Sequence, residues 1–369
     1  MKIASYVQMN RLINPTGVGK HIINVLPAIA GRPGLELSLM TSRQYLGPDG
    51  KLPATNPLSG LPVAGIPLPQ KALDILWLGA GAPSADRWAG GADWIYCPVE
   101  TPVPSRHARL AVTCHCLNML EADLPWSAAA DTRTNRRWWR RRMDAIRRKA
   151  EIVFVVSEFL RDRTAALAGI SPNRMVVVGN GAEKDYFAVA ETPRRPVHRP
   201  YLIAVGGLTA RKGAPLILGT ARALLERRSE IEVWVAGKSE PNYAAEAKAL
   251  PNLRQLGYKG LDELPRLVRD AVALIFPSRY DTFGIPAVES MAAGTPPIVS
   301  HWAGLPEVVG DGGIVLNNGS GGGEIADIVV DLATNGRLRA EVAARGRQRA
   351  KRFTWEACAD RIVDALKRP

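Results

Sequence analysis

The stretch FPSRYDTFGIPAVESMAAGTP, residues 276–296, joins an apolar run to a helical pattern and carries two carboxylates eight positions apart. The apolar run before it predicts a buried strand. Gly284 allows a helix to begin at the next residue, and a second glycine ten residues later ends it. The stretch therefore predicts a strand, a loop that holds Asp281, and a helix that holds Glu289.

The same alternation of short β-rich runs and longer helical patterns continues along the whole chain. Apolar runs that are bounded by Gly, Ser or Pro and separated by helices indicate buried parallel strands in βαβ units. We therefore predict an α/β protein with two doubly wound, Rossmann-like domains. The expected strands are residues 2–7, 35–42, 94–100, 110–115, 152–157 and 174–180 in the first half, and 201–207, 231–237, 273–278 and 296–300 in the second.

The domain boundary is expected between residues 180 and 200, where turn residues and prolines replace the periodic pattern. We place the first domain at 1–185 and the second at 186–353. The closing residues, 354–369, have helical spacing and are expected to pack back on the first domain. Two segments rich in glycine or proline are expected to be irregular: 47–69 and 319–323.

Composition excludes several classes of protein. The 369 residues are 46% hydrophobic, enough for large cores, and no uncharged apolar run reaches the roughly 18 residues of a spanning helix. The chain begins as a strand, so we expect a cytoplasmic protein. Four cysteines are too few for a disulfide framework. The CHC triplet at 114–116 is compatible with zinc, but no second pair of ligands at zinc spacing accompanies it.

The net charge of +13 is concentrated in the first half, because residues 1–180 carry 22 basic and 13 acidic residues. Such a balance favours an anionic partner. Residues 133–149 are the most basic segment and predict a helix with one apolar stripe through Trp139, Met143 and Ile146. This helix is either a core-facing stripe with a solvated basic side or a site for a lipid headgroup or pyrophosphate. No nucleic-acid recognition motif accompanies it, so we expect no nucleic-acid partner.

In an open α/β sheet, ligands bind at the carboxyl ends of the strands. The backbone N–H groups of Phe283, Gly284 and Ile285 would point into that crevice, and Asp281 and Glu289 could accept hydroxyls of one extended ligand. The alternative is that Asp281 only caps the helix and that Glu289 is a solvated helix residue.

Two further segments follow first strands and begin helices. The segment GGLTARKG, residues 206–213, offers Arg211 and Lys212 as a clamp for a diphosphate. The segment NPTGVGKHI, residues 14–22, is a glycine-rich entry in the other half of the chain. A single Gly-x-Gly is weak evidence for a ligand site, whereas a glycine-rich start of a helix in each half of the chain is stronger evidence.

These segments, together with LAVTCHC, VVVGNGAEKDYF and GLPEVVGDGG, resemble the retaining GT-B glycosyltransferases of family 4, in particular bacterial group 1 mannosyltransferases. The resemblance implies two Rossmann-like domains that face a central cleft. It also implies transfer of a hexose from a nucleotide sugar, with GDP-mannose slightly preferred to UDP-hexoses. The implied acceptor is a glycan or a polyprenyl-diphosphate-linked intermediate of envelope or exopolysaccharide synthesis, which would suit a peripheral position on the cytoplasmic membrane.

The resemblance also implies a role for each matching residue. Glu289 would bind the ribose hydroxyls of the donor, and Asp281, with His115, would contact the transferred sugar. The implied diphosphate ligands are Arg211 and Lys212, helped by the loop Gly17, Val18 and Gly19, and the nucleobase would lie against the loop 256–260 that holds Tyr258. Without the resemblance, His115 would read as a buried structural histidine at a strand end.

The chain departs from the family pattern at two positions. Asp281 replaces the usual Glu, and Gly207 stands where many members have Arg, so that Arg211 must supply the guanidinium. The chain has no Asp-x-Asp triplet, and we expect Arg211 and Lys212 to replace a metal ion, with no cofactor. The rival interpretations are a nucleotide-sugar or polyanion binding protein without catalysis, and a GT-B phosphorylase or epimerase.

Overall fold

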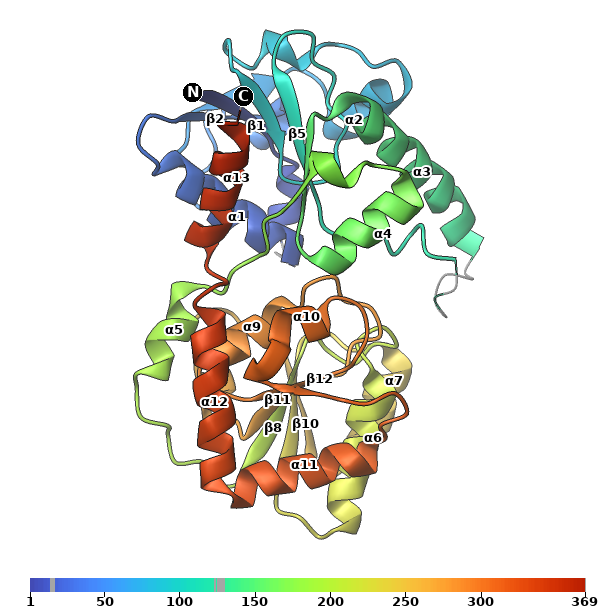
Figure 1. The fold of residues 1–369 in the computed structure, drawn as a ribbon, viewed down its shortest axis with the longest axis vertical. Coiled ribbons are helices and arrows are strands. Elements are labelled where there is room, and N and C mark those ends of the chain that lie inside the picture. Colours follow the sequence, from blue (N-terminus) through green and yellow to red (C-terminus); the bar gives the residue numbers. More distant parts are fainter. Residues whose placement is uncertain (14–16, 123, 125–129, 369) are drawn as a thin grey trace. The chain divides into compact units, whose positions relative to one another are not determined.

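The structure is a computed structural model, and it describes residues 1–13, 17–122, 124 and 130–368. The chain divides into two compact units (Figure 1). The first consists of Met1–Asn180 with Trp355–Pro369, and the second of Gly181–Thr354. The prediction placed this boundary between residues 185 and 186.

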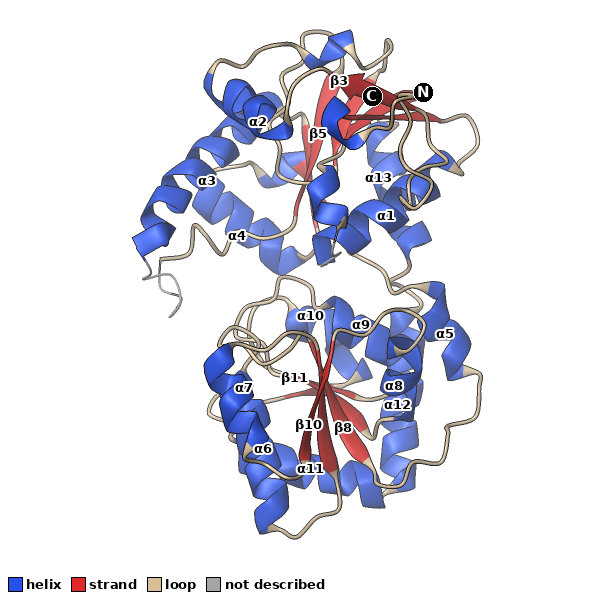
Figure 2. Cartoon of the chain, turned by 180° about the vertical axis from the view of Figure 1, so that it is seen from behind, coloured by secondary structure: helices blue, strands red, loops and turns tan. Residues whose placement is uncertain are grey.

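The first unit is built on a parallel sheet with the strand order β3-β2-β1-β4-β5-β6-β7. Figure 2 shows strands in red and helices in blue. Its strands are β1 (Lys2–Tyr6), β2 (Glu36–Ser42), β3 (Val63–Ile66), β4 (Trp94–Cys97), β5 (Arg109–Cys114), β6 (Ile152–Val155) and β7 (Met175–Val177). Its helices are α1 (Gly17–Ala30), α2 (Gln70–Gly79), α3 (Ala130–Lys149), α4 (Glu158–Ala168) and α13 (Trp355–Leu366). Helix α1 packs against α13, and α3 packs against α2 and α4.

The second unit is built on another parallel sheet, with the order β10-β9-β8-β11-β12-β13. Its strands are β8 (Tyr201–Val205), β9 (Glu232–Ala236), β10 (Leu253–Gly257), β11 (Ala273–Phe276), β12 (Pro297–Val299) and β13 (Ile314–Val315). Its helices are α5 (Lys184–Ala190), α6 (Ala214–Glu226), α7 (Pro241–Lys248), α8 (Leu264–Asp270), α9 (Ile285–Ala292), α10 (Leu305–Val309), α11 (Gly322–Thr334) and α12 (Gly336–Ala350). The central strands β8 and β11 pair with Ile203 opposite Leu274, and α6 and α11 pack together over the sheet.

Both sheets wind outward from a central pair of strands, β1 with β4 and β8 with β11. Because every pair is parallel, the carboxyl ends of all strands in a unit lie along one edge of its sheet. The predicted α/β class is confirmed. The loops after β8, β11 and β12 therefore share one edge, and the loops after β1 and β5 share the corresponding edge of the first unit.

Two details of the sequence prediction are wrong. The segment 47–69 was expected to be irregular, but it contains β3, and the expected flexible loop at 319–323 ends where α11 begins at Gly322. Strands β10 and β13 were also not predicted. All three of these strands lie at sheet edges, where the exposed or half-buried residues need no continuous apolar run.

The C-terminal helix α13 belongs to the first unit. The Trp94 indole N–H donates to the Leu366 carbonyl oxygen at 3.0 Å, and Arg361 donates to the Val178 carbonyl oxygen at 2.8 Å. Cys358 donates its S–H to the carbonyl oxygen of Gly179. These bonds hold the helix to β4 and to the segment after β7.

Helix α3 contains the basic segment. Met143 and Ile146 are buried, as the apolar stripe predicts, and Trp139 is half-buried. Trp138, which is not part of the stripe, is 41% exposed. Arg137, Arg140 and Arg141 are exposed, but Arg136 is half-buried and donates to the Met119 and Glu121 carbonyl oxygens. A fully solvated basic side, one of the two alternatives for this helix, therefore does not include Arg136. The side chains of residues 130–134 lie outside the described part.

Arg147 and Arg148, at the end of the same helix, share the carboxylate of Asp144. In the described residues, no helix combines the length and the apolar character that crossing a bilayer requires.

Candidate functional site

Three loops at the carboxyl edge of the second sheet are tied together by hydrogen bonds. The Arg279 N–H donates to the Arg211 carbonyl oxygen at 2.8 Å, so the loop after β11 is bonded to the loop after β8. The Ser300 hydroxyl donates to the Ser278 carbonyl oxygen, and the Gly304 N–H donates to the Asp281 carbonyl oxygen at 3.0 Å. The side chains on these loops are consequently held in one surface.

The centre of this surface is an ion pair between Lys212 and Asp281. The Lys212 Nζ lies 2.7 Å from Asp281 Oδ2 and 4.3 Å from the centre of the Phe276 ring. Arg211 is the second cation, with Nη1 at 3.8 Å from the same carboxylate and at 3.1 Å from the Tyr280 carbonyl oxygen. The arrangement confines two cations and one carboxylate to the start of α6.

The electrostatics keep Asp281 ionised. Burial raises the pKa of this carboxyl group, but the charge and hydrogen bond of Lys212, with Arg211 and the Phe283 N–H, outweigh burial and lower the pKa below its usual value. An ionised carboxylate accepts hydrogen bonds and donates none, so Asp281 is suited to bind hydroxyl groups.

The structure excludes the simpler interpretation of this stretch. Helix α9 begins after Gly284 without a side-chain cap, so Asp281 does not cap it. Glu289 is 2% exposed and is therefore not a solvated helix residue. Burial, followed by the charge of Glu289, raises the pKa of the Tyr186 phenol, so Tyr186 lies near this carboxylate. The sequence did not point to Tyr186.

The predicted row of outward N–H groups needs a correction. The Phe283 N–H is directed at Asp281 Oδ1, at 3.4 Å, instead of pointing freely into the crevice. Gly284 has φ of +86°, and a Cβ atom there would lie 2.3 Å from Leu305 Cδ2. The start of α9 therefore requires glycine at this position both for its conformation and for its packing against α10.

The structure also explains the departure at Gly207. This residue has φ of +74°, and a Cβ atom would lie 2.0 Å from the Lys238 carbonyl oxygen. No side chain fits between the ends of β8 and β9, so the first guanidinium after β8 is that of Arg211. Tyr258, after the neighbouring strand β10, is 74% exposed and presents its ring to solvent.

The candidate residues of the first unit lie at the carboxyl edge of its own sheet. Gly17, Val18 and Gly19 form the first turn of α1, after β1, and residues 14–16 of the predicted glycine-rich entry lie outside the described residues. His115 follows β5 and is 6% exposed. Its Nε2 lies 2.8 Å from the Pro98 carbonyl oxygen, which requires a proton on Nε2.

The environment of His115 favours a neutral ring. Burial lowers the pKa of its imidazole, although the Glu100 charge acts in the opposite direction. The buried Glu100 carboxylate accepts the N–H groups of His115 and Cys116 through Oε1, the second at 3.2 Å. Glu100, which the sequence did not suggest, thus fixes the backbone from which the imidazole projects.

A second buried histidine lies beside His115. The ring centres of His21 and His115 are 4.7 Å apart, and His21 bonds to Asn180 through Nδ1 and to the Tyr96 hydroxyl through Nε2. Burial, and then His115, lower the pKa of His21. Burial therefore favours the neutral form of both rings.

The CHC triplet is part of this buried region. Burial raises the pKa of the Cys114 thiol. In the ranges that the structure describes, no three His, Cys, Asp or Glu side chains gather closely enough to hold a metal ion.

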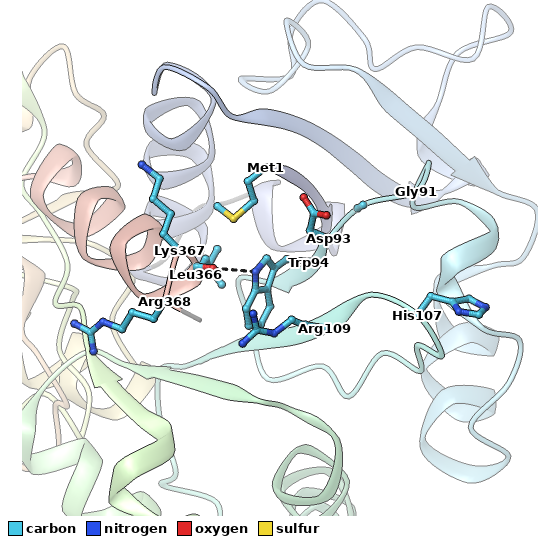
Figure 3. A pocket seen from close by; sticks show the side chains of 10 residues that line it. Met1, Gly91, Asp93, Trp94, His107, Arg109, Leu366, Lys367 and Arg368 are labelled. Carbon is cyan, nitrogen blue, oxygen red and sulfur yellow. Dashed lines mark hydrogen bonds between the residues drawn. The ribbon is translucent and has the colours of Figure 1, made fainter.

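A pocket in the first unit, drawn in Figure 3, is lined by none of these residues. It is lined at the amino ends of β4 and β5 by Asp93, Trp94 and Arg109, and by Lys367 and Arg368 after α13. The Arg109 guanidinium lies 4.2 Å from the centre of the Trp94 ring. Because His115 follows the carboxyl end of β5, this pocket is at the opposite edge of the sheet and is not the candidate site.

Comparison with known families covers nearly the whole chain. Residues 15–186 match the family model described as Glycosyltransferase Family 4, and residues 185–349 match the model described as Glycosyl transferases group 1.

Among curated relatives, the O-antigen chain mannosyltransferase B of Escherichia coli is 28% identical over 232 residues, which cover 59% of this chain and 61% of that protein. The MMP alpha-(1->4)-mannosyltransferase of Mycolicibacterium hassiacum is 28% identical over 250 residues, which cover 62% and 59%. The chain thus aligns with about three-fifths of the length of these two relatives.

Among solved structures, the Anabaena protein HepE in complex with UDP and glucose superposes with a TM-score of 0.71 and 19% identity, over the full length of both chains. This similarity shows the shared fold. The predicted GT-B fold class is confirmed.

The pairing of Asp281 with Lys212 predicts a pH dependence of stability. Because the pKa of Asp281 is lower in the folded protein than its unfolded value of about 3.9, the ionised group stabilises the fold above that pH, and this contribution is lost on acidification. The difference in free energy of unfolding between the native chain and Asp281→Asn should therefore be largest above about pH 5 and shrink toward pH 3. Urea unfolding measured over this range checks the expectation.

The matched control is Asp327→Asn, which breaks an ion pair whose carboxylate is 64% exposed and should show a small, nearly pH-independent effect. A difference for Asp281→Asn that stays constant from pH 3 to pH 7 would contradict the electrostatic assignment.

Proposed function

Because the chain belongs to the family 4 and group 1 glycosyltransferases, we propose that it transfers a hexose from a nucleotide sugar to a glycan or lipid-linked acceptor, with retention of configuration. The observation that carries the proposal is the cluster of Lys212, Arg211 and Asp281 at the carboxyl edge of the second sheet. This edge is where α/β folds bind nucleotides. The buried Glu289 lies on the helix that begins there.

The cluster has the charges that a sugar diphosphate requires. The ammonium of Lys212 and the guanidinium of Arg211 would bind the diphosphate and stabilise the charge that develops on the leaving group. Asp281 would accept hydroxyl hydrogen bonds from the transferred sugar, so Lys212 would lie between two anions when the donor is bound. The one-methylene shorter side chain of Asp281 is compatible with this contact, because its carboxylate already reaches Lys212 at 2.7 Å.

The remaining donor contacts follow from chemistry and position. Glu289, which lies near the buried Tyr186, would accept both ribose hydroxyls. The exposed ring of Tyr258 would stack on the nucleobase.

The first unit would supply His115 at the transferred sugar and the backbone of Gly17–Gly19 at the phosphates. A neutral His115 with its proton on Nε2 leaves Nδ1 as the acceptor nitrogen.

The retaining step needs no carboxylate nucleophile. In the proposed mechanism, the departing diphosphate oxygen takes the acceptor's proton on the face from which it leaves. Two cations already lie at the start of α6, so we propose that transfer requires no divalent metal ion.

We propose GDP-mannose as the donor, with UDP-hexoses as the second choice. Two of the relatives are mannosyltransferases by name, whereas the similar HepE structure contains UDP and glucose. The acceptor is proposed to be an intermediate of envelope or exopolysaccharide synthesis. A nucleotide-sugar binding protein without catalysis is the alternative, and turnover distinguishes the two.

The test is to incubate the protein with GDP-mannose, UDP-glucose and related nucleotide sugars, with and without a chelator, and to measure release of the nucleoside diphosphate. We expect release from one donor, and we expect it to survive chelation. Binding of a donor without release would support the alternative function. Complete loss with the chelator, reversed by added Mg²⁺ or Mn²⁺, would contradict metal-independent transfer.

Substitutions at the cluster should suppress transfer while the fold remains intact. For Glu289→Ala, and for the double change Arg211→Ala with Lys212→Ala, we expect a loss of about 2 to 5 kcal/mol, or roughly 30-fold to several thousand-fold in activity, because each removes charged hydrogen bonds to the donor. The Glu289 change should also weaken binding of the nucleotide itself.

The matched control for these variants is Glu324→Ala, which removes a carboxylate from the first turn of α11, distant in sequence from the three loops. Circular dichroism establishes that each variant is folded. Normal turnover and donor affinity in the cluster variants would remove the assignment.

We further propose that α3 brings the first unit to an anionic membrane surface, as a peripheral protein on the cytoplasmic side. Arg137, Arg140 and Arg141 are exposed, and the half-exposed Trp138 adds an indole that is suited to the headgroup level. Such a surface would place a lipid-linked acceptor beside the enzyme.

Changing these three exposed arginines to Ser should weaken binding to anionic vesicles by up to about a hundredfold, at about 1 kcal/mol for each basic residue. Co-sedimentation with vesicles of graded anionic content at low and high salt measures this, since salt screens the attraction over about 8 Å. The control removes three exposed charges from the second unit: Arg195→Ser, Arg199→Ser and Lys248→Ser. Equal binding to neutral and anionic vesicles would leave α3 as a solvated helix.

A further inference from the structure

The loop after β12, which is hydrogen-bonded to the loop that holds Asp281, carries an exposed tryptophan. Trp302 is 50% exposed, although most large apolar side chains of this unit are buried. Its loop is bonded to the site from both sides, because Ser300 donates to the Ser278 carbonyl oxygen and the Gly304 N–H donates to the Asp281 carbonyl oxygen at 3.0 Å. The indole therefore belongs to the same rigid edge as the carboxylate.

The backbone that presents this indole is strained. Ala303 has φ of +59°. In the described part of the chain, Ala303 and Arg228 are the residues other than glycine that adopt positive φ. An L-residue in this conformation is disfavoured by about 1 to 2 kcal/mol, and such strain persists where the surroundings enforce it. Here the Gly304 bond to Asp281 and the buried Leu305 side chain, packed over Gly284, enforce it.

The orientation of the indole is also restricted. The ring centres of His301 and Trp302 are 4.6 Å apart, with an angle of 37° between the planes. One side of the indole thus has an aromatic neighbour, while half of the side chain stays accessible to solvent. The loop thus presents a flat apolar surface two residues before its backbone bond to Asp281. An apolar surface and an ionised carboxylate are the two elements that a sugar ring requires.

A pyranose has hydroxyl groups around its rim and a face of C–H bonds. Asp281 can accept hydrogen bonds from the rim, but a carboxylate provides no apolar surface for the face. We propose that Trp302 packs on the C–H face of a hexose bound at Asp281 and thereby helps to select that sugar. The proposal rests on the proposed function. The hexose comes either from the donor or from the acceptor, and the two sources give different kinetic results.

The experiment compares Trp302→Ala and Trp302→Phe with the native chain. Calorimetry measures the affinity for GDP, UDP, GDP-mannose and UDP-glucose, and steady-state kinetics measure KM for the donor and the acceptor. A stacked aromatic contact of typical strength corresponds to about a 2- to 12-fold change in affinity. We expect Trp302→Ala to have this much lower affinity for the sugar-bearing ligand and unchanged affinity for the nucleoside diphosphate. We expect Trp302→Phe to keep most of the native affinity.

The source of the hexose follows from which value changes. If Trp302→Ala has a lower affinity for the nucleotide sugar and a higher donor KM, Trp302 contacts the donor's hexose. If only the acceptor KM rises, Trp302 contacts a hexose of the acceptor. Either result supports the proposed contact between Trp302 and a hexose. Ile75→Ala, which removes a 59% exposed apolar side chain from α2, is the matched control and should change none of these values.

A binding measurement that needs no turnover separates this proposal from the proposed function. Saturation-transfer NMR with methyl α-mannoside and methyl α-glucoside should show contact with ring protons in the native chain and its loss in Trp302→Ala. If the native chain releases no nucleoside diphosphate, the proposed function fails, and this measurement still tests Trp302. The proposed contact between Trp302 and a hexose would be overturned if the native and Trp302→Ala proteins showed equal affinities, equal KM values and equal saturation transfer.

Discussion

The ion pair between Lys212 and Asp281 is the interaction on which the rest of the site depends. It joins the loop after β8 to the loop after β11, and it exists because these two strands are neighbours in a parallel sheet. A partly buried carboxylate is costly unless a cation is in contact with it, and Lys212 provides that contact at 2.7 Å. The pair also leaves the site with one net positive charge when Arg211 is included, which favours an anionic ligand.

Close backbone approach makes this arrangement possible. A Cβ atom at Gly213 would lie 2.2 Å from the Pro277 carbonyl oxygen, and one at Gly207 would lie 2.0 Å from the Lys238 carbonyl oxygen. Neither neighbour is a flexible side chain that could move aside. Gly213 therefore sets how near the start of α6 comes to the end of β11, and hence whether Lys212 reaches Asp281, whereas Gly207 sets the approach of the loops after β8 and β9.

Much of the fold could be predicted from the sequence, because a buried strand needs a continuous apolar run and a helix needs a start and a stop. The central strands, the start of α9 after Gly284 and the terminal helix were all predictable in this way. The edge strands β3, β10 and β13 were not, since half-exposed edges carry no apolar signal. The resemblance to the family pointed to Asp281, Glu289, Arg211 and Lys212 together. It implied what each residue would bind, but not which of them are in contact.

The sequence by itself determined the α/β alternation, the two halves and the residue types available at the ends of the strands. Only the tertiary structure decided that Asp281 pairs with Lys212, that Glu289 is buried near Tyr186, and that Glu100 holds the backbone at His115. It also decided that Trp302 stays exposed on a loop that is hydrogen-bonded to the loop that holds Asp281. The physical reason is that charge pairing, burial and exposure depend on which loops meet at one edge of a sheet, and that meeting is set by strand order, which local sequence patterns do not encode.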